Sequence, residues 1–466
     1  MKHKIKLENI MCVFIILCPI LDIASFVFRN TFNTKISPST IIRPIIPAIA
    51  ILFLFIKKDR KFKKNMIIVG TIYAVYAAIH IYLFSKIKTG MSFGSETHEL
   101  QYIINYTFMI INLIVFTTVF KDENVEKLNK IILISTGIYI GSIYIAILTK
   151  TSSHTYIEGM GYKGWFESGN SISSILLLTM FIYLPYVKEK KYRNFIIPII
   201  ILVGAFLSML IGTRAGLFGF ILVIALYMGI EVLFNIIRNK KIDKKFLIIG
   251  ITGLAIVILV VIGFGSTTIQ RRKHLKDIES DIIDESSQEN AHITGSTLRI
   301  KEQIENNEIV EGYMSESQKQ SIMDLYNIAN KLQVKNNDQR MQQLIYNLAL
   351  VKNQKNILLI LFGNGYVANF SELVLEMELI SMLLNFGIVG FALYMGPFIA
   401  ILFAGLYYGI KYRKVIDSQY AFLWFGLAMA FALSLLSGYT FFNLSSMIII
   451  VSLSTNLMKK MKEYKS

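Results

Sequence analysis

The chain has 466 residues, of which 54% are hydrophobic, and it carries a formal net charge of +17 at pH 7. The apolar residues form uninterrupted blocks of about 17–25 residues, the length that a helix needs to cross a bilayer. These blocks exclude a soluble globular protein, and they lack the alternating pattern of a membrane β-barrel. The basic residues lie in short clusters between the blocks, which argues for membrane topology and against nucleic-acid binding.

Nine apolar blocks precede a long polar stretch, and three more follow it. The first block comes after the basic segment Met1–Lys6, as in a signal peptide, but it is long and lacks a small-residue cleavage site, so we expect a retained helix. It holds both cysteines, Cys12 and Cys18, which suggest neither a disulfide framework nor a metal site. We expect spans at 7–28, 40–56, 66–84, 101–120, 130–149, 171–187, 194–211, 215–236, 246–264, 388–410, 419–436 and 440–457.

Basic clusters alternate with loops nearly free of lysine and arginine, and this alternation predicts the orientation of the chain. Both termini are expected in the cytoplasm, and the polar stretch 265–372 is expected outside. More than half of the 48 lysines and arginines lie in the expected cytoplasmic clusters, which are Lys2–Lys6, Lys57–Lys64, Lys121–Lys130, Lys188–Arg193, Arg238–Lys245, Lys411–Lys414 and Lys459–Lys465.

The sequence therefore predicts an all-α, multi-pass protein of the cell membrane with about 12 transmembrane helices. Residues 1–264 would hold the first nine helices, and 265–372 would form a large extracytoplasmic helical loop domain. Residues 373–466 would hold a short outer-face helix, at 374–387, and the last three spans. This assignment follows because 373–410 is apolar enough for nearly two crossings, whereas the orientation allows one.

Two amphipathic helices are predicted in the outer loop, joined near Asn336–Asp338. One carries Ile322, Leu325, Ala329 and Leu332 at helical spacing, and the other carries Met341, Leu344, Ile345 and Leu348. No internal repeat is visible, which counts against an inverted-repeat transporter.

Outward-facing cations are the first candidates for chemistry. Arg214 lies at the outward turn between two apolar blocks, where it would either bind phosphate through its planar guanidinium or extend toward lipid phosphate. Arg340 opens the second outer helix and Arg299 lies upstream of it, although arginines in such a loop are often solvated. Arg43 and Lys163 are similar outward cations with weaker support.

Polar residues around the sixth span form a second candidate group. The segment Tyr162–Asn170 contains Trp165, which suits an interfacial anchor, and also Glu167 and Asn170, which could hold a sugar at the membrane surface.

Two carboxylates, Glu376 and Glu378, lie in an otherwise apolar run, where a charge is costly unless it is used. On a helix they would point about 200° apart, so that one faces a site and the other solvent. Such a carboxylate could deprotonate an attacking hydroxyl, or it could simply favour the start of a helix. The six histidines are scattered, and no nucleotide-binding loop, metal-ligand motif or catalytic triad is evident.

These motifs resemble the O-antigen ligase and polymerase family of bacterial membrane glycosyltransferases. Gly212-Thr-Arg-Ala-Gly216 is similar to the family's arginine turn, and Gly164-Trp-Phe-Glu-Ser-Gly-Asn170 is similar to its motif before a mid-chain span. Arg340 followed by Phe362-Gly-Asn-Gly365 resembles the end of the family's outer loop. Counting back eleven residues from Gly387 reaches Glu376, where many ligases carry histidine. An acid at that position looks more like the polymerase-type members.

The resemblance implies a GT-C-like membrane enzyme whose donor is an oligosaccharide on undecaprenyl pyrophosphate, presented at the outer face. The expected reaction is polymerisation or transfer of repeat units for capsule, O-antigen-like or wall polysaccharide. We expect no nucleotide, because the sugar is already activated, and no metal or other cofactor. The expected partners are the lipid-linked oligosaccharide and membrane lipid, with a flippase and a chain-length regulator as protein partners, and no nucleic acid.

Roles for the candidate residues follow from this reaction. Guanidinium groups would stabilise the departing pyrophosphate, and a carboxylate would act as the base. The catalytic residues would be Glu376, Arg214 and Arg340, and the substrate-binding residues Arg299, Glu378, Asn170, Glu167, Lys163 and Arg43.

Three alternatives remain open. The protein could be a ligase that uses another acceptor, a flippase or transporter for lipid-linked saccharide, or an envelope sensor whose outer domain binds a ligand. A flippase should carry charged residues along a central cavity at mid-membrane depth, whereas the candidate charges here are expected at the outer face.

Overall fold

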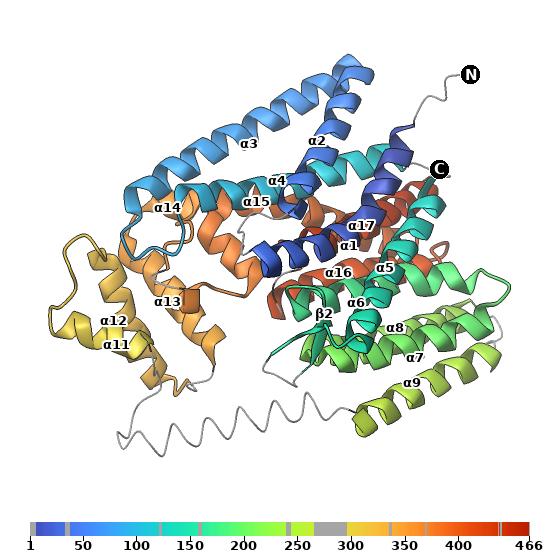
Figure 1. Cartoon of the computed structure of the whole chain (residues 1–466). Helices are drawn as coiled ribbons and strands as arrows, with labels where there is room; N and C mark the ends of the chain where they lie inside the picture. Colours follow the sequence, from blue (N-terminus) through green and yellow to red (C-terminus); the bar gives the residue numbers. More distant parts are fainter. Residues whose placement is uncertain are drawn as a thin grey trace. The chain divides into compact units, whose positions relative to one another are not determined.

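The computed structural model describes residues 6–32, 38–120, 124–156, 161–238, 244–264, 296–334, 338–368, 371–436, 438 and 440–465. Helices account for most of these residues (Figure 1). Two short antiparallel strands, β1 (Ser153–His154) and β2 (Tyr162–Gly164), interrupt the helical pattern. The first part of the predicted outer loop, 265–295, lies outside the described residues, as do Asn336 and Asn337 at the predicted junction.

Each predicted span overlaps a helix, which confirms the all-α membrane class. Within the described ranges, nine helices are long and apolar enough to cross a membrane. They are α1 (Leu7–Phe32), α3 (Arg60–Ile87), α4 (Glu96–Val119), α5 (Asn124–Leu148), α6 (Gly169–Lys188), α7 (Arg193–Ile211), α8 (Arg214–Ile237), α15 (Glu378–Lys411) and α16 (Ser418–Leu436). Helices α2 (Pro38–Lys57), α9 (Lys244–Phe264) and α17 (Leu444–Glu463) overlap the other three predicted spans. The count of twelve crossings stays a prediction.

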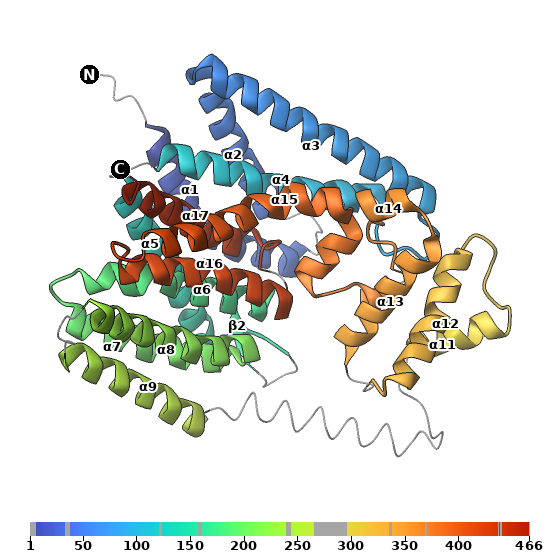
Figure 2. The ribbon, with the colours of Figure 1, turned by 180° about the vertical axis from the view of Figure 1, so that it is seen from behind.

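The chain divides into two compact units, each described here by itself. Unit 1 comprises Met1–Lys58, Phe108–Arg271 and Phe398–Ser466. Helix α6 is central to this unit, because it packs against α5, α7, α8, α16 and α17 and is the most deeply buried of the candidate spans. Helices α7, α8 and α9 pack side by side, as the green ribbons show in Figures 1 and 2.

Unit 2 comprises Asp59–Thr107 and Arg272–Pro397. It contains α3, the first part of α4, α11 (Ser296–Glu305), α12 (Glu316–Lys331), α13 (Gln339–Gln354), α14 (Ile357–Phe362), a 3-10 turn (Ser371–Leu373) and the first part of α15. Its core joins α12 and α13 to α3 and to the segment after α14. The residues of that core include Phe84, Ile322, Leu325, Tyr346, Leu350 and Val367.

The two predicted amphipathic helices are present as α12 and α13, but one buried face differs from the prediction. On α12, Ile322, Leu325 and Ala329 are fully buried, as expected, whereas Leu332 lies beyond the last turn and is exposed. On α13 the predicted stripe is only partly correct, because Ile345 is buried whereas Met341 and Leu348 are exposed.

The buried face of α13 contains polar side chains that the apolar pattern overlooks. Gln343 Nε2 donates to the Glu372 carbonyl at 2.9 Å, and Asn347 Nδ2 donates to the Leu373 carbonyl at 2.9 Å. These bonds offset the cost of burying the two amides. Gln343 and Asn347 therefore face the 3-10 turn, and the helix is rotated relative to the predicted stripe.

The predicted short helix begins at Glu378, four residues later than expected, and the backbone leaves helical geometry at Gly387, with φ 69° and ψ 179°. A Cβ at this position would overlap the Gly363 nitrogen and the Leu361 carbonyl. Glycine therefore allows both the unusual backbone and the close approach of a second segment. Because Glu376 precedes the helix, the expectation that Glu376 and Glu378 lie about 200° apart on one helix is wrong.

Candidate functional site

Two motifs of unit 1 that are far apart in the sequence lie side by side. A Cβ on Gly161 would overlap the carbonyl oxygen of Ile211, and a Cβ on Gly169 would lie 3.4 Å from Thr213 Cγ2. Ser173 Oγ and Thr213 Oγ1 are 2.6 Å apart. The segment that ends at Asn170 therefore packs against the turn that carries Arg214.

The turn before Arg214 follows from two local signals. Helix α7 ends at Gly212, which adopts a left-handed conformation with φ 74°. Thr213 then caps α8 by accepting a hydrogen bond from the Gly216 amide. Arg214 is the first residue of α8, its side chain is exposed, and it makes no hydrogen bond or ion pair with the part of the chain that the structure describes. Its guanidinium thus stands at the positive end of a helix dipole, where an anion is favoured.

The other predicted polar residues near the turn that carries Arg214 are half-exposed. Lys163 Nζ donates to the Glu167 carbonyl at 2.8 Å, and the Glu167 carboxylate pairs with Arg29 of α1 at 2.6 Å. Burial lowers the pKa of Lys163, and the nearby Glu167 charge opposes that change. Asn170 lies in the first turn of α6, after the cap residue Ser168. The structure thus adds Arg29, which the sequence did not single out, to the predicted Lys163, Glu167 and Asn170.

Arg43 occupies a different environment from the other candidate cations, because its side chain is only 6% exposed. Its Nη2 lies 2.7 Å from Asp22 Oδ1 and donates to the Cys18 carbonyl. The other carboxylate oxygen, Asp22 Oδ2, accepts hydrogen bonds from Tyr139 and Ser445. This buried group links α1, α2, α5 and α17.

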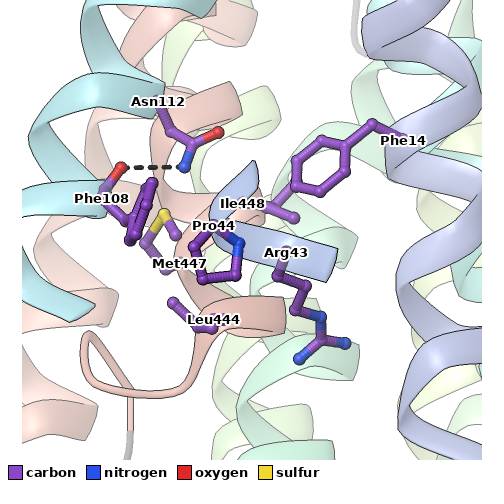
Figure 3. Close-up of a pocket in the computed structure, with 8 residues that line it drawn as sticks. All are labelled: Phe14, Arg43, Pro44, Phe108, Asn112, Leu444, Met447 and Ile448. Carbon is purple, nitrogen blue, oxygen red and sulfur yellow. Dashed lines mark hydrogen bonds between the residues drawn. The ribbon is translucent and has the colours of Figure 1, made fainter. Parts of the chain in front are cut away.

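A small cavity adjoins Arg43, with apolar walls and two unpaired polar atoms. Figure 3 shows Arg43 and Pro44 beside side chains of α1, α4 and α17, with Asn112 donating to the Phe108 carbonyl. Arg43 Nε and Asn112 Oδ1 are buried without a hydrogen-bond partner among the described residues. The cavity is about one water molecule in size, at about 10 Å³.

In unit 2, the structure brings Arg340 and Glu376 together. Arg340 Nε lies 3.4 Å from Glu376 Oε2, and the side chains are 40% and 39% exposed. Arg340 is in the first turn of α13, and Glu376 lies in the irregular segment just before α15. Gln343 Oε1, one turn along α13, accepts a hydrogen bond from the Glu376 amide at 3.1 Å. Glu376 is therefore held against α13 through both its side chain and its backbone amide, and its carboxylate remains accessible.

The other two candidates of unit 2 differ in burial. Glu378 begins α15 and is 6% exposed, whereas Arg299 on α11 is exposed and makes no hydrogen bond or ion pair with any described residue. Of the two predicted carboxylates, Glu376 is thus the one that a dissolved or membrane-bound substrate can reach.

Two ionisable residues of unit 2 were missed in the sequence. His80 on α3 and Glu99 on α4 are both fully buried and lie 3.0 Å apart. They contact the turn that contains Phe362-Gly-Asn-Gly365. The hint in the sequence was their position within or beside a predicted span, where ionisable residues are usually functional. Nothing in the local sequence indicated that the two form a pair.

The chain matches the family described as O-antigen ligase like membrane protein over residues 4–464. No match was found among curated proteins. The match covers nearly the whole chain, including both units and every candidate residue above, and it supports a role in processing lipid-linked glycans in the membrane. The protein therefore belongs to the O-antigen ligase-like family of membrane proteins.

Proposed function

We propose that the protein is a polymerase for oligosaccharide repeat units carried on undecaprenyl pyrophosphate, acting at the outer face of the cytoplasmic membrane. The product would be a capsule, O-antigen-like or wall polysaccharide. The observation that carries this proposal is the half-exposed pair of Arg340 and Glu376, because it combines a general base with a cation suited to phosphate. Family membership supports the substrate class.

The proposed reaction forms one bond and breaks another at the anomeric carbon. Glu376 takes the proton from an acceptor hydroxyl, whose oxygen bonds to the anomeric carbon of the donor. The bond between that carbon and the pyrophosphate oxygen breaks, and the leaving group gains negative charge. No nucleotide is required, because the pyrophosphate ester already activates the sugar, and the proposal assigns charge stabilisation to arginines rather than to a metal.

Arg340 has a role in both stages of this reaction. Before the reaction it pairs with the Glu376 carboxylate at 3.4 Å, an exposed contact that is weak enough to be exchanged. Once Glu376 is protonated, its negative charge is lost, and the Arg340 guanidinium becomes available to phosphate oxygens. The base and the cation are in this way coupled through one ion pair.

Arg214 is proposed to bind the pyrophosphate of a lipid-linked substrate. Its exposed guanidinium and its position at the start of α8 support this role. Lys163, Glu167 and Asn170, in the same unit as Arg214, are proposed to bind sugar hydroxyls. Arg299, in unit 2, is proposed separately as a phosphate contact. Glu378 and Arg43 are buried, so either could bind substrate only after giving up protein contacts.

A ligase would use the same chemistry with a different acceptor hydroxyl. Glu376 in place of the histidine of many ligases favours the polymerase. A flippase is less favoured, because Arg214, Arg299 and the pair Arg340–Glu376 are all exposed or half-exposed rather than enclosed.

The test uses purified protein with a lipid-pyrophosphate-linked repeat unit and no nucleotide sugar or added metal. We expect a ladder of longer lipid-linked products, and we expect the rate to fall about 100-fold or more in Arg214→Ala, Arg340→Ala and Glu376→Gln. Arg413→Ala, in an expected cytoplasmic cluster, should retain the wild-type rate. Wild-type activity in all three site variants, correctly folded, would refute the proposed site, and the absence of a ladder would refute the polymerase.

A further inference from the structure

A buried histidine and glutamate of unit 2 hold both ends of one turn. The side chains of His80 and Glu99 are each 0% exposed. His80 Nδ1 lies 2.7 Å from the Phe362 carbonyl oxygen, and Glu99 Oε1 accepts a hydrogen bond from the Tyr366 amide at 2.7 Å. The His80 ring also stacks on Phe386, with 5.0 Å between ring centroids. Ionisable groups at such depth are costly unless their bonding capacity is used, as it is here.

The carbonyl partner determines where the protons lie. Because the Phe362 oxygen can only accept, His80 Nδ1 must carry a hydrogen. One further proton lies between His80 Nε2 and Glu99 Oε2, which are 3.0 Å apart. Whether that proton belongs to the imidazole or to the carboxyl, the pair has no net charge. Both groups then use their remaining capacity on the backbone of the turn.

The turn 362–366 contains two glycines at positions where the backbone conformation and the close packing exclude a side chain. Gly363 and Gly365 have φ of 89° and 65°. A Cβ on Gly365 would overlap the side chains of Phe84 and Glu99, and a Cβ on Gly363 would overlap the carbonyl of Asn385. The pair His80–Glu99, which we call the clamp, and the two glycines therefore belong to one arrangement, in which the turn packs against the end of the short helix.

That contact satisfies the carbonyls at the end of the helix that starts at Glu378. Asn364 N donates to the Leu384 carbonyl at 3.2 Å, and Gly365 N donates to the Asn385 carbonyl at 2.8 Å. On α3, Tyr76 donates through its hydroxyl to the Phe386 carbonyl at 2.8 Å. The last carbonyls of a helix lack partners within the helix, so these three bonds fix where the short helix ends and how it is oriented.

The start of the same helix lies two residues after Glu376, the proposed base. Glu376 is held on one side by Arg340 and Gln343 of α13. On the other side it is joined to the short helix, which is held through the turn by His80 and Glu99. We propose that His80 and Glu99 are positioning residues that fix the turn 362–366, and through it the short helix and the Glu376 carboxylate. This inference rests on the proposed function.

The first test compares two substitutions of Glu99. In Glu99→Gln, the amide can donate to His80 Nε2 while its oxygen accepts from Tyr366 N, so every hydrogen bond is kept and the rate should stay within about threefold of wild type. In Glu99→Leu, both partners lose their bonds. Since a displacement of about 1 Å can cost about 100-fold, we expect kcat to fall by about that factor. The KM for the lipid-linked donor should change less than threefold.

A matched control lies one turn away on the same helix. Glu96 is also a glutamate, but it is 40% exposed, pairs with Lys88, and makes no hydrogen bond or ion pair with the described residues of the turn. Glu96→Leu should retain the wild-type kcat. If Glu99→Leu is folded and keeps wild-type kcat, the positioning role is wrong. It is equally wrong if Glu99→Gln loses as much activity as Glu99→Leu, because the shared proton rather than the hydrogen bonds would then be required.

Hydrogen exchange gives a readout that does not depend on activity. Amides of Leu379–Phe386 should exchange at least tenfold faster in Glu99→Leu and at the wild-type rate in Glu99→Gln and Glu96→Leu. Faster exchange in Glu99→Leu, together with a wild-type protein that makes no product, would support the clamp and reject the proposed function. Unchanged exchange and unchanged kcat in Glu99→Leu, with an active wild type, would reject the clamp alone.

Discussion

At the scale of single residues, the ionisable side chains of this protein lie in two different environments. Arg214, Arg299 and the pair Arg340–Glu376 are accessible, whereas Arg43 and His80 are buried against acids in their own units. In the sequence nothing local distinguishes the residues that will be buried from those that will stay accessible. Burial separates them, since a buried cation needs an anion of the protein and an exposed one can take an anion of the substrate.

The pair Asp22–Arg43, in which Arg43 is buried and Asp22 is 21% exposed, should contribute to stability rather than to catalysis. Arg43→Ala removes the cation that faces the Asp22 carboxylate. Breaking a fully buried pair costs about 3–5 kcal/mol, and the cost here should be smaller because Asp22 is partly exposed. We expect a clear loss of thermal stability in detergent, measured as the midpoint of unfolding. The double substitution Asp22→Asn with Arg43→Met should recover part of it, because no unpaired charge remains. Equal destabilisation in the single and double variants would contradict this explanation.

At the scale of elements, glycines decide where helices stop and which segments touch. Gly212 ends α7 next to Arg214, and Gly387 separates the short helix from the long part of α15. The sequence predicted a break near Asn385–Gly387, because too much apolar chain lay between two fixed sides of the membrane. It did not predict that Gly387 receives the turn at Gly363, since this contact joins segments that are distant in the chain.

Gly387→Ala tests this element directly. The backbone at φ 69° and ψ 179° is accessible to glycine and costs other residues about 1–3 kcal/mol, and the added methyl group would overlap Gly363 and Leu361. We expect a lower unfolding midpoint together with a reduced rate of the proposed reaction. Gly396→Ala is the matched control on the same helix, because a Cβ there meets nothing within 4 Å. Similar losses in both variants would argue against the steric cause.

At the scale of the whole molecule, the orientation of the chain in the membrane can be tested. Nine of the described helices suit a bilayer by length and composition, and the basic clusters predict which ends face the cytoplasm. Both native cysteines are buried, so single introduced cysteines can report the orientation. We expect Met341→Cys on α13 to react with a membrane-impermeant maleimide in intact cells, and Lys63→Cys to react only after the membrane is opened. The opposite pattern would invert the proposed topology and move the proposed site to the cytoplasmic face.

The sequence by itself determined the membrane class and the approximate position of each long apolar helix, because hydrophobicity and length act locally and a bilayer imposes one thickness on every span. It misplaced the buried face of α13, where Gln343 and Asn347 are satisfied by carbonyls of a distant turn. Family-like spacing pointed to Arg340 and Glu376 separately, but only the tertiary structure joined them. His80 and Glu99 were not singled out in the sequence, and only the tertiary structure showed that they form a pair. The role of an ionisable side chain depends on the partner that folding brings to it.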